Sequence, residues 1–305
     1  MTSRRIAAEH TGPVTIDAAL LGYAGTITVR AESDCERATL TVRTADEEGE
    51  AADLVRDATL RQSGTGGLYA SVQGKGGSTS GGTTIITGGG RRVVQSFGVI
   101  TGSVTGMTVI GGNVTVNGVR IGANANGATI ITGASPIEII AVVPEGSSVI
   151  GRTQSADIIT EGALLNITGH TQSGDVRTGH VAKVLASTKS GDVVVDRAAH
   201  ISAKSIGGDL RFGRTDVVEA ETVGGDIHIA DFGGTARLKT VGGDIRVHAT
   251  AGGDINARTV GGDIDVTATE AALDDNLDVQ SNTVGGRVRT PQRRRPSGGP
   301  RRRSF

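Results

Sequence analysis

An aspartate follows a pair of small residues again and again in the second half of this sequence. The octapeptides TVGGDIHI, TVGGDIRV and TVGGDIDV begin at residues 222, 240 and 259. The same place in seven units is taken by Asp157, Asp175, Asp192, Asp209, Asp226, Asp244 and Asp263. A recurring carboxylate of this kind can accept backbone N–H groups in a tight turn, or it can supply oxygen ligands to a hard cation such as Ca²⁺.

The spacing favours the turn over the cation. Calcium-binding β-rolls repeat a glycine-rich motif about every nine residues, whereas these aspartates stand 17 to 19 residues apart and lack the third glycine of that motif. Only AGGDIN, residues 251–256, imitates the shorter spacing. We therefore expect a structural ladder of aspartates at successive turns, with a calcium ladder as the alternative.

No other set of residues has a spacing typical of catalysis. The six histidines form no HxxxH or HExxH pair, and the single cysteine, Cys35, allows neither a zinc set nor an intramolecular disulfide. Polysaccharide-active β-helices need clustered acids beside aromatic sugar platforms, and aromatic residues make up only 2% of this chain. The sequence thus predicts no catalytic residue, no cofactor and no metal; a polysaccharide-active or calcium-dependent enzyme is the least favoured function.

The elements that must position the aspartates follow from the residues around them. The residue after each aspartate is aliphatic, the fourth residue before it is Thr or Ser, and apolar positions alternate with period two on both sides. An eighth unit carries Arg287 in place of the aspartate, 24 residues after Asp263. Each unit is predicted to be a strand, a tight turn and a strand, with glycine supplying the positive φ that a sharp corner needs.

Two short strands cannot bury their inner faces alone, but stacked units can. The sequence therefore predicts an all-β protein, a single-stranded β-solenoid (β-helix) over 136–290 with two-strand rungs of 17–19 residues. Residues 1–72 are predicted to form a β-rich N-terminal cap with a helix near 47–62. Residues 73–135 are predicted to be Gly-rich irregular β rungs or an insert, and 291–305 a disordered Arg-rich tail.

Basic residues recur on the outward side of the predicted rungs. Arg or His stands two residues after the anchor position in five of the eight units, and Arg287 to Phe305 include eight Arg and no acid. The candidate docking residues are Arg177, Arg211, His228, Arg246, Arg289, Arg293, Arg294, Arg295, Arg301, Arg302 and Arg303. Such a surface suits an acidic macromolecule, whether a protein, an anionic glycan or a nucleic acid; a solvated surface that discourages aggregation is the alternative.

The VGGDI and SGDV repeats, preceded by AVVPEGSSV and a β-rich N-terminus, resemble the DUF4097 family of candidate adhesins, also called β-strand-repeat proteins. The resemblance covers about 10–72 and 136–290, with 73–135 as a variable insert. It implies a fold similar to single-stranded β-helix proteins and brings no catalytic residues. The bias toward Ala, Arg and Gly suits a high-GC actinobacterial genome.

The function predicted from the sequence is a non-catalytic, adhesin-like scaffold that docks a macromolecular partner through its basic stripes or its tail. A self-assembling, filament-like element is the alternative, because uncapped solenoid ends can stack. No stretch of 18 apolar residues and no apolar leader region is present, so we expect a cytoplasmic protein without a transmembrane segment.

Overall fold

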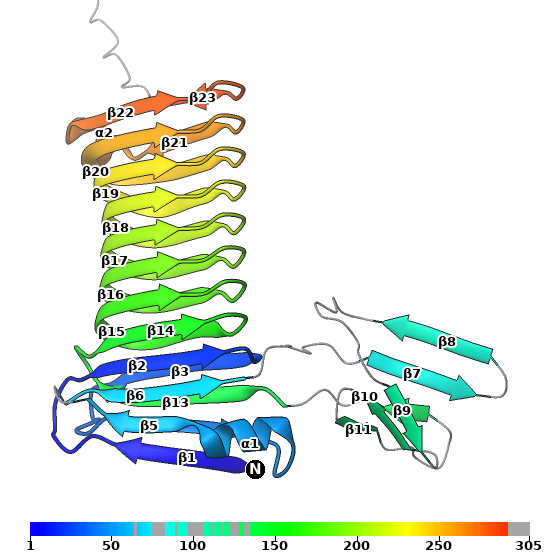
Figure 1. The fold of residues 1–305 in the computed structure, drawn as a ribbon. Helices are drawn as coiled ribbons and strands as arrows, with labels where there is room; N and C mark the ends of the chain where they lie inside the picture. The colour runs from blue at the N-terminus through cyan, green and yellow to red at the C-terminus, as the bar shows by residue number, and fades with distance from the viewer. Residues whose placement is uncertain are drawn as a thin grey trace, which may run out of the picture.

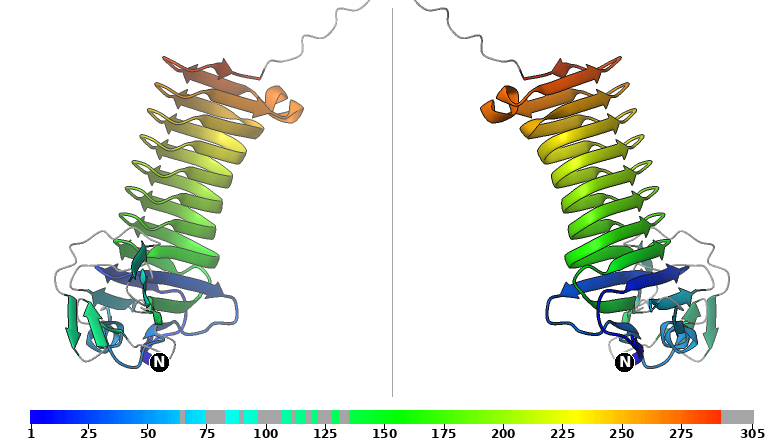
Figure 2. Two further views of the ribbon diagram at one scale, coloured as in Figure 1. Left: turned by 90° about the vertical axis from the view of Figure 1, so that its right-hand side faces the viewer. Right: turned by 90° about the vertical axis from the view of Figure 1, so that its left-hand side faces the viewer.

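The structure is a computed structural model that describes residues 1–63, 66–74 and 135–291, and between them the backbone of six short strands. Its main feature is a column of parallel β rungs stacked along one axis (Figures 1 and 2). The rungs belong to one sheet of 17 strands, which confirms the β-solenoid. They are formed by β14 (Ser148–Thr153), β15 (Asp157–His170), β16 (Val176–Ser187), β17 (Val193–Lys204), β18 (Leu210–Glu221), β19 (Ile227–Lys239), β20 (Ile245–Arg258), β21 (Ile264–Ala268), β22 (Leu277–Asn282) and β23 (Val288–Arg289).

Each complete rung is one long strand that bends. β16, β17 and β18 each run for 12 residues, from the position after the aspartate to the position before the Thr or Ser of the next turn. Parallel pairing keeps one register along the stack, so that Val176 pairs with Val193 and Val193 with Leu210. Equivalent side chains of successive rungs therefore lie on one another.

The inward side chains form aliphatic columns. The residues after the aspartates are at most 1% exposed: Ile158, Val176, Val193, Leu210, Ile227, Ile245 and Ile264. A further buried column lies at the bend and is not visible as a repeat of period two: Leu164, Val181, Ala198, Thr215, Phe232 and Ala249. In β16 the bend shifts the alternation, because buried Thr178 is followed by buried Val181. Burying one such aliphatic side chain contributes about 1.5–3 kcal/mol, so these columns stabilise the stack although they include few aromatic residues.

The second glycine of each turn pair is required by space rather than by backbone angle. None of the paired glycines in the rung turns is among the described glycines with positive φ, so our expectation of positive φ is wrong. A Cβ on Gly208, the second of a pair, would lie 1.9 Å from the carbonyl oxygen of Gly191 in the rung below. A Cβ on Gly207, the first of that pair, would lie 3.6 Å from Lys189 O, an ordinary contact. Successive turns therefore touch backbone to backbone at the second glycine, and serine is tolerated at the first.

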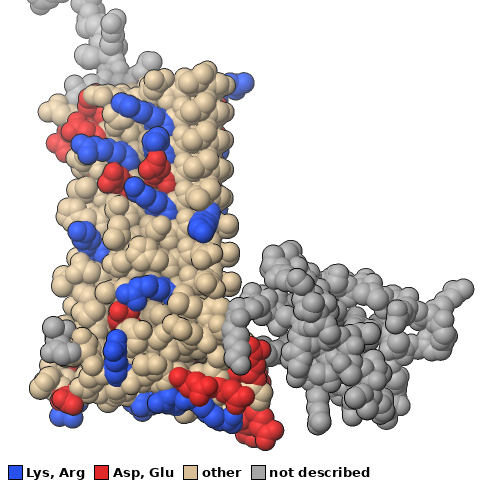
Figure 3. All heavy atoms as spheres, viewed as in Figure 1, with Lys and Arg blue, Asp and Glu red and all other residues tan. Residues whose placement is uncertain are grey.

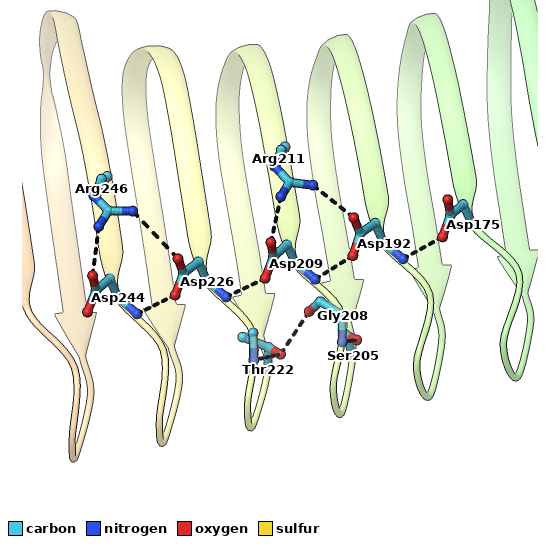
Figure 4. A network of polar contacts seen from close by, with 11 residues as sticks. Asp175, Asp192, Ser205, Gly208, Asp209, Arg211, Thr222, Asp226, Asp244 and Arg246 are labelled. Atoms are coloured by element: carbon cyan, nitrogen blue, oxygen red, sulfur yellow. Dashed lines mark hydrogen bonds and ion pairs between the residues drawn. The ribbon is translucent and has the colours of Figure 1, made fainter.

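The Thr or Ser that opens each turn closes it with its hydroxyl. Thr188 Oγ1 accepts the N–H of Gly191 at 3.0 Å. The same bond is made by Thr171, Ser205, Thr222, Thr240, Thr259 and Thr283. Thr222 Oγ1 also donates to the carbonyl of Gly208 one rung below, at 3.2 Å (Figure 4). The hydroxyl thus satisfies a buried amide within its turn and links two turns.

The N-terminal strands continue the stack. They are β1 (Thr2–Ala7), β2 (Thr15–Leu21), β3 (Gly25–Glu32), β4 (Thr39–Thr44), β5 (Thr59–Gln62) and β6 (Leu68–Gln73), joined by β13 (Ile137–Pro144). β2 pairs in parallel with β14 and β6, and β3 pairs in parallel with β15 and β13. Strands distant in sequence therefore form the first layers on which the regular rungs rest (Figure 1).

This N-terminal end of the solenoid is closed. β4 pairs antiparallel with β13 and β1, and helix α1 (Glu50–Asp57) packs on these strands with Ala51, Ala52 and Val55 fully buried. The helix predicted near 47–62 is thus shorter, because Thr59–Gln62 pair with β6 as β5. Its first turn carries Glu50 and Asp53, which the helix dipole favours.

Strands β7 (Thr83–Gly88), β8 (Arg91–Ser96), β9 (Met107–Ile110), β10 (Asn113–Val116), β11 (Val119–Ile121) and β12 (Ala128–Ile130) form two sheets of three strands. Within the described residues they pair only with one another and antiparallel, whereas a rung pairs in parallel with its neighbours. The rest of 75–134 and the predicted tail beyond 291 lie outside the described residues.

A second helix, α2 (Glu270–Asp274), was not expected from the sequence. It occupies the long step before the last rung, where Thr269 Oγ1 accepts the N–H of Ala272 and Ala272 is buried. In Figure 2 it lies beside the C-terminal end of the stack. Without a complete heptad to show periodicity, a helix of this length leaves little signal in the sequence.

The space at the turns predicts different outcomes for two neighbouring substitutions. Gly208→Ala places a Cβ against Gly191 O and is expected to lower the free energy of unfolding by about 3 kcal/mol, as severe overpacking does. Gly207→Ala is expected to change it by less than about 0.5 kcal/mol. Urea unfolding of both variants checks this; equal losses would contradict the close approach at the second glycine.

Two buried threonines, one inside β16 and one in the turn that follows it, are expected to respond with opposite sign. Thr178 Oγ1 has no hydrogen-bond partner in the described part of the chain, and valine fills the same column at Val195. Thr178→Val should therefore raise the free energy of unfolding by about 1 kcal/mol, whereas Thr188→Val should lower it by about 1–3 kcal/mol because the Gly191 amide loses its acceptor. Thermal and urea unfolding measure both; destabilisation by Thr178→Val would argue against an unpartnered hydroxyl.

Candidate functional site

The aspartates form a continuous hydrogen-bonded ladder beside the turns (Figure 4). Asp192 Oδ1 accepts the backbone N–H of Asp209 at 2.9 Å, and Asp209 Oδ1 accepts that of Asp226 at 2.9 Å. The same bond, 2.7–2.9 Å long, joins every step from Asp157 to Arg287. Each carboxylate therefore accepts an amide of the next rung rather than one in its own turn, and it ties the two rungs together.

Arginines two residues after the aspartate bridge the ladder in alternate rungs. Arg211 donates from Nη1 to Asp192 at 2.8 Å and from Nη2 to Asp209 at 2.5 Å. Arg246 is 3.5 Å from Asp226 and donates to Asp244 at 2.7 Å, and Arg177 pairs in the same way with Asp157 and Asp175. One guanidinium thus serves two stacked carboxylates, which reduces their mutual repulsion and fits the presence of an arginine at every second rung.

These contacts perturb the charged groups in the expected directions. The hydrogen bond with Asp192, aided by Asp209, raises the pKa of the Arg211 guanidinium above its ordinary value although desolvation opposes it. On the rungs nearby, Lys239 donates to Glu221 at 2.7 Å and Lys204 lies 3.8 Å from it. The bond with Lys239 lowers the pKa of the Glu221 carboxyl. Both groups are fully charged near neutral pH.

The candidate docking residues divide into three groups. Arg177, Arg211 and Arg246 are about half exposed but are engaged in the ladder. His228 and Arg289 have exposed side chains and make no ion pair within the described residues. The remaining candidates lie outside the described residues: Arg293, Arg294, Arg295, Arg301, Arg302 and Arg303. The structure therefore brings the ladder aspartates and three arginines together, and of the other described candidates it places His228 and Arg289 outside these ion pairs.

An exposed apolar ridge runs along the turns and was missed in reading the sequence. The residue before each glycine pair is 42–82% exposed in five successive rungs, at Ile206, Val223, Val241, Val260 and Val284. In Figure 3 the turn edge of the solenoid is mostly free of charged side chains. The signal was present in the repeated TVGGD, whose valine lies out of phase with the period-two alternation of the buried positions.

The described part of the chain offers few groups arranged for metal binding or catalysis. No three His, Cys, Asp or Glu residues there are placed to hold a metal ion. A shallow depression of about 500 Å³ is lined by Asp17, Arg61 and Tyr69 among others, but Arg152 holds Asp17 at 2.6 Å and Arg61 stacks 4.5 Å from the Tyr69 ring. Neither described helix is long and apolar enough to cross a membrane.

Parallel bent rungs, touching glycine turns and a shared carboxylate ladder define a β-solenoid repeat protein. The model of the Toastrack family, DUF4097, matches residues 100–298, and the chain belongs to this family. The match includes all the regular rungs and the ladder from Asp157 to Arg287.

Several solved structures are similar to this chain. A candidate adhesin from Parabacteroides distasonis has 14% identity and a TM-score of 0.46, covering 94% of this chain and 95% of that chain. A candidate adhesin from Bacteroides fragilis has 13% identity and a TM-score of 0.41, covering 94% and 96%. A candidate lipid-binding protein from Parabacteroides distasonis has 11% identity and a TM-score of 0.39, covering 95% and 97%. No curated protein matches this sequence.

The two roles of each ladder carboxylate can be separated by substitution. Asp209→Ala removes the acceptor of the Asp226 amide and is expected to lower the free energy of unfolding by about 1–3 kcal/mol. Asp209→Asn keeps that acceptor and loses mainly the ion pair with Arg211, for a cost of about 1 kcal/mol or less. Asp216→Ala, at an exposed aspartate outside the ladder, is the control. Urea unfolding that ranks Asn with Ala would contradict the amide bond as the main contribution.

Proposed function

We propose that this protein is a non-catalytic, adhesin-like scaffold that presents its turn edge to an acidic macromolecular partner. The apolar ridge defined above carries the proposal. An exposed strip of five aliphatic side chains in a row is unusual on a soluble surface and is typical of a contact surface. The protein is adhesin-like in the sense that a stiff rod displays a strip of docking residues.

Cations border the ridge and favour an acidic partner. Lys204, Lys239 and Arg258 each stand two residues before a ridge residue, with Glu221 as the one acid in that column. The ladder arginines are committed to aspartates, whereas Lys204 and Lys239 share the single carboxylate of Glu221, so this border keeps a net positive charge beside the ridge. An apolar strip with a charged border matches the anatomy of protein interfaces, in which rim charges steer association.

The proposal is tested by binding of the full chain to polyglutamate, heparin and duplex DNA, which represent an acidic protein, an anionic glycan and a nucleic acid. We expect one of them to bind at low salt and to be released as salt rises, because exposed charges are screened. Val223→Ser with Val241→Ser should weaken that binding, whereas Leu185→Ser, at an exposed apolar residue away from the ridge, should not.

A chain ending at Thr290 distinguishes the ridge from the Arg-rich tail. Binding that survives this truncation supports the turn edge, and binding that disappears with it assigns docking to the tail and contradicts the ridge. Failure of all three polyanions to bind at low salt contradicts the acidic partner altogether.

Self-assembly remains a second candidate because of one observation, the difference between the two ends of the solenoid. The N-terminal end is closed by α1 and antiparallel strands, while the C-terminal end is not covered by any described element. A filament would need complementary surfaces at both ends.

A further inference from the structure

The C-terminal end of the solenoid is an open cross-section of its core. Leu277 and Val279 of β22 are half-buried and Val288 of β23 is 43% exposed. One rung below, Ile255 and Ile264 in the same columns are 2% and 0% exposed. Helix α2 lies beside this end and not over it (Figure 2). Apolar columns that are sealed everywhere else are therefore exposed at the last rung.

The edge of β22 also carries unpaired backbone groups. Asn282 O accepts the N–H of Thr259 in the rung below, so Asn282, Gln280 and Asp278 turn their backbone groups down the stack. Because a strand alternates, Leu277, Val279 and Ser281 turn their N–H and C=O groups outward. In the described part of the chain β22 pairs only with β20. An exposed strand edge of this kind favours pairing with another strand.

The last rung is not suited to a further rung in the same direction. In every earlier step an aspartate accepts the amide of the rung above, but Arg287 stands in that place and cannot accept. The opposite end of a second copy presents α1 and β1 rather than a rung. Continuation head to tail is therefore disfavoured on both sides, and the surface that remains is the same end of another copy.

We propose that two copies of this chain join end to end through their last rungs, related by a two-fold axis, so that β22 pairs antiparallel with β22 of the second copy. This deepens the self-assembly candidate and rests on it. The pairing is centred on Val279. It places Leu277 opposite the second copy's Ser281, so that inward side chains meet inward side chains and the outward N–H and C=O groups meet each other. The two cores become one, and the isologous contact closes as a dimer rather than a filament.

Charge complementarity supports this occupant. β22 starts at the corner that holds exposed Glu270, Asp274 and Asp278, and it runs to the turn that holds exposed Arg287 and Arg289. The two-fold axis places the turn of one copy over the acidic corner of the other, twice in each dimer. Neither arginine makes an ion pair within the described residues of its own chain.

Sedimentation equilibrium of the full chain tests the inference, and a mass twice that of the monomer is expected. Val279→Lys places a charge in the centre of the contact and should raise the dimer dissociation constant on the order of 100-fold. Gln280→Lys, on the same strand but facing outward beside the second copy's Asp278, is the control and should leave the dimer intact. Circular dichroism and thermal unfolding establish that both variants remain folded.

A charge swap tests the orientation. Arg287→Glu with Arg289→Glu should weaken the dimer about 10-fold, and adding Asp274→Arg with Asp278→Arg to the same chain should restore it. A monomeric full chain would overturn the dimer and self-assembly together. Filaments would overturn the dimer while supporting self-assembly, and a dimer that tolerates Val279→Lys would place the contact elsewhere. All of these outcomes are independent of polyanion binding.

Discussion

The close approach of the backbone at successive turns is the constraint on which the rest of this solenoid depends. Gly208 lies against Gly191 with no room for a Cβ, and the same contact recurs at every regular turn. Turns held this close bring each aspartate carboxylate within hydrogen-bond distance of the next rung's amide. The parallel register, the aliphatic columns and the threonine bonds all follow from turns that stack without offset. A single larger residue at the second glycine would disturb all of them.

Stacking equivalent residues also stacks like charges, and an arginine at every second rung compensates the repulsion between the aspartates. Three arginines each serve two carboxylates, so the outward charge of this face is largely satisfied within the molecule. The sequence had predicted these same arginines to be part of a docking stripe. These ion pairs shift the expected contact surface toward the turn edge, where the aliphatic ridge is exposed and two lysines share one glutamate.

The two ends of the column differ in a way that matters for assembly. At the N-terminal end, Ala51 and Val55 of α1 seal the core, and arginines on the edge strand β1 discourage pairing. At the C-terminal end the columns stop at half-buried Leu277 and Val279, and the carboxylate ladder stops at Arg287. Two rods of this kind, each with one sealed end and one open end, can pair through their open ends. Each copy then displays its own turn edge.

The sequence by itself determined the solenoid, its period and its ladder positions, because a repeat of 17–19 residues with alternating apolar positions has few ways to bury its inner face. It did not show that β2, β3 and β6 extend the stack, or that the bend adds a buried column at Val181 and Phe232, because both depend on pairing between distant segments and on where alternation breaks. The tertiary structure alone decided the chemistry of the ladder. Asp, Arg and Gly were recognisable as a repeated turn, but only stacked rungs could show that each carboxylate binds the next rung's amide and shares its neighbour's arginine. A sequence specifies what recurs along the chain, and the partner one rung away is set by how the recurring units pack.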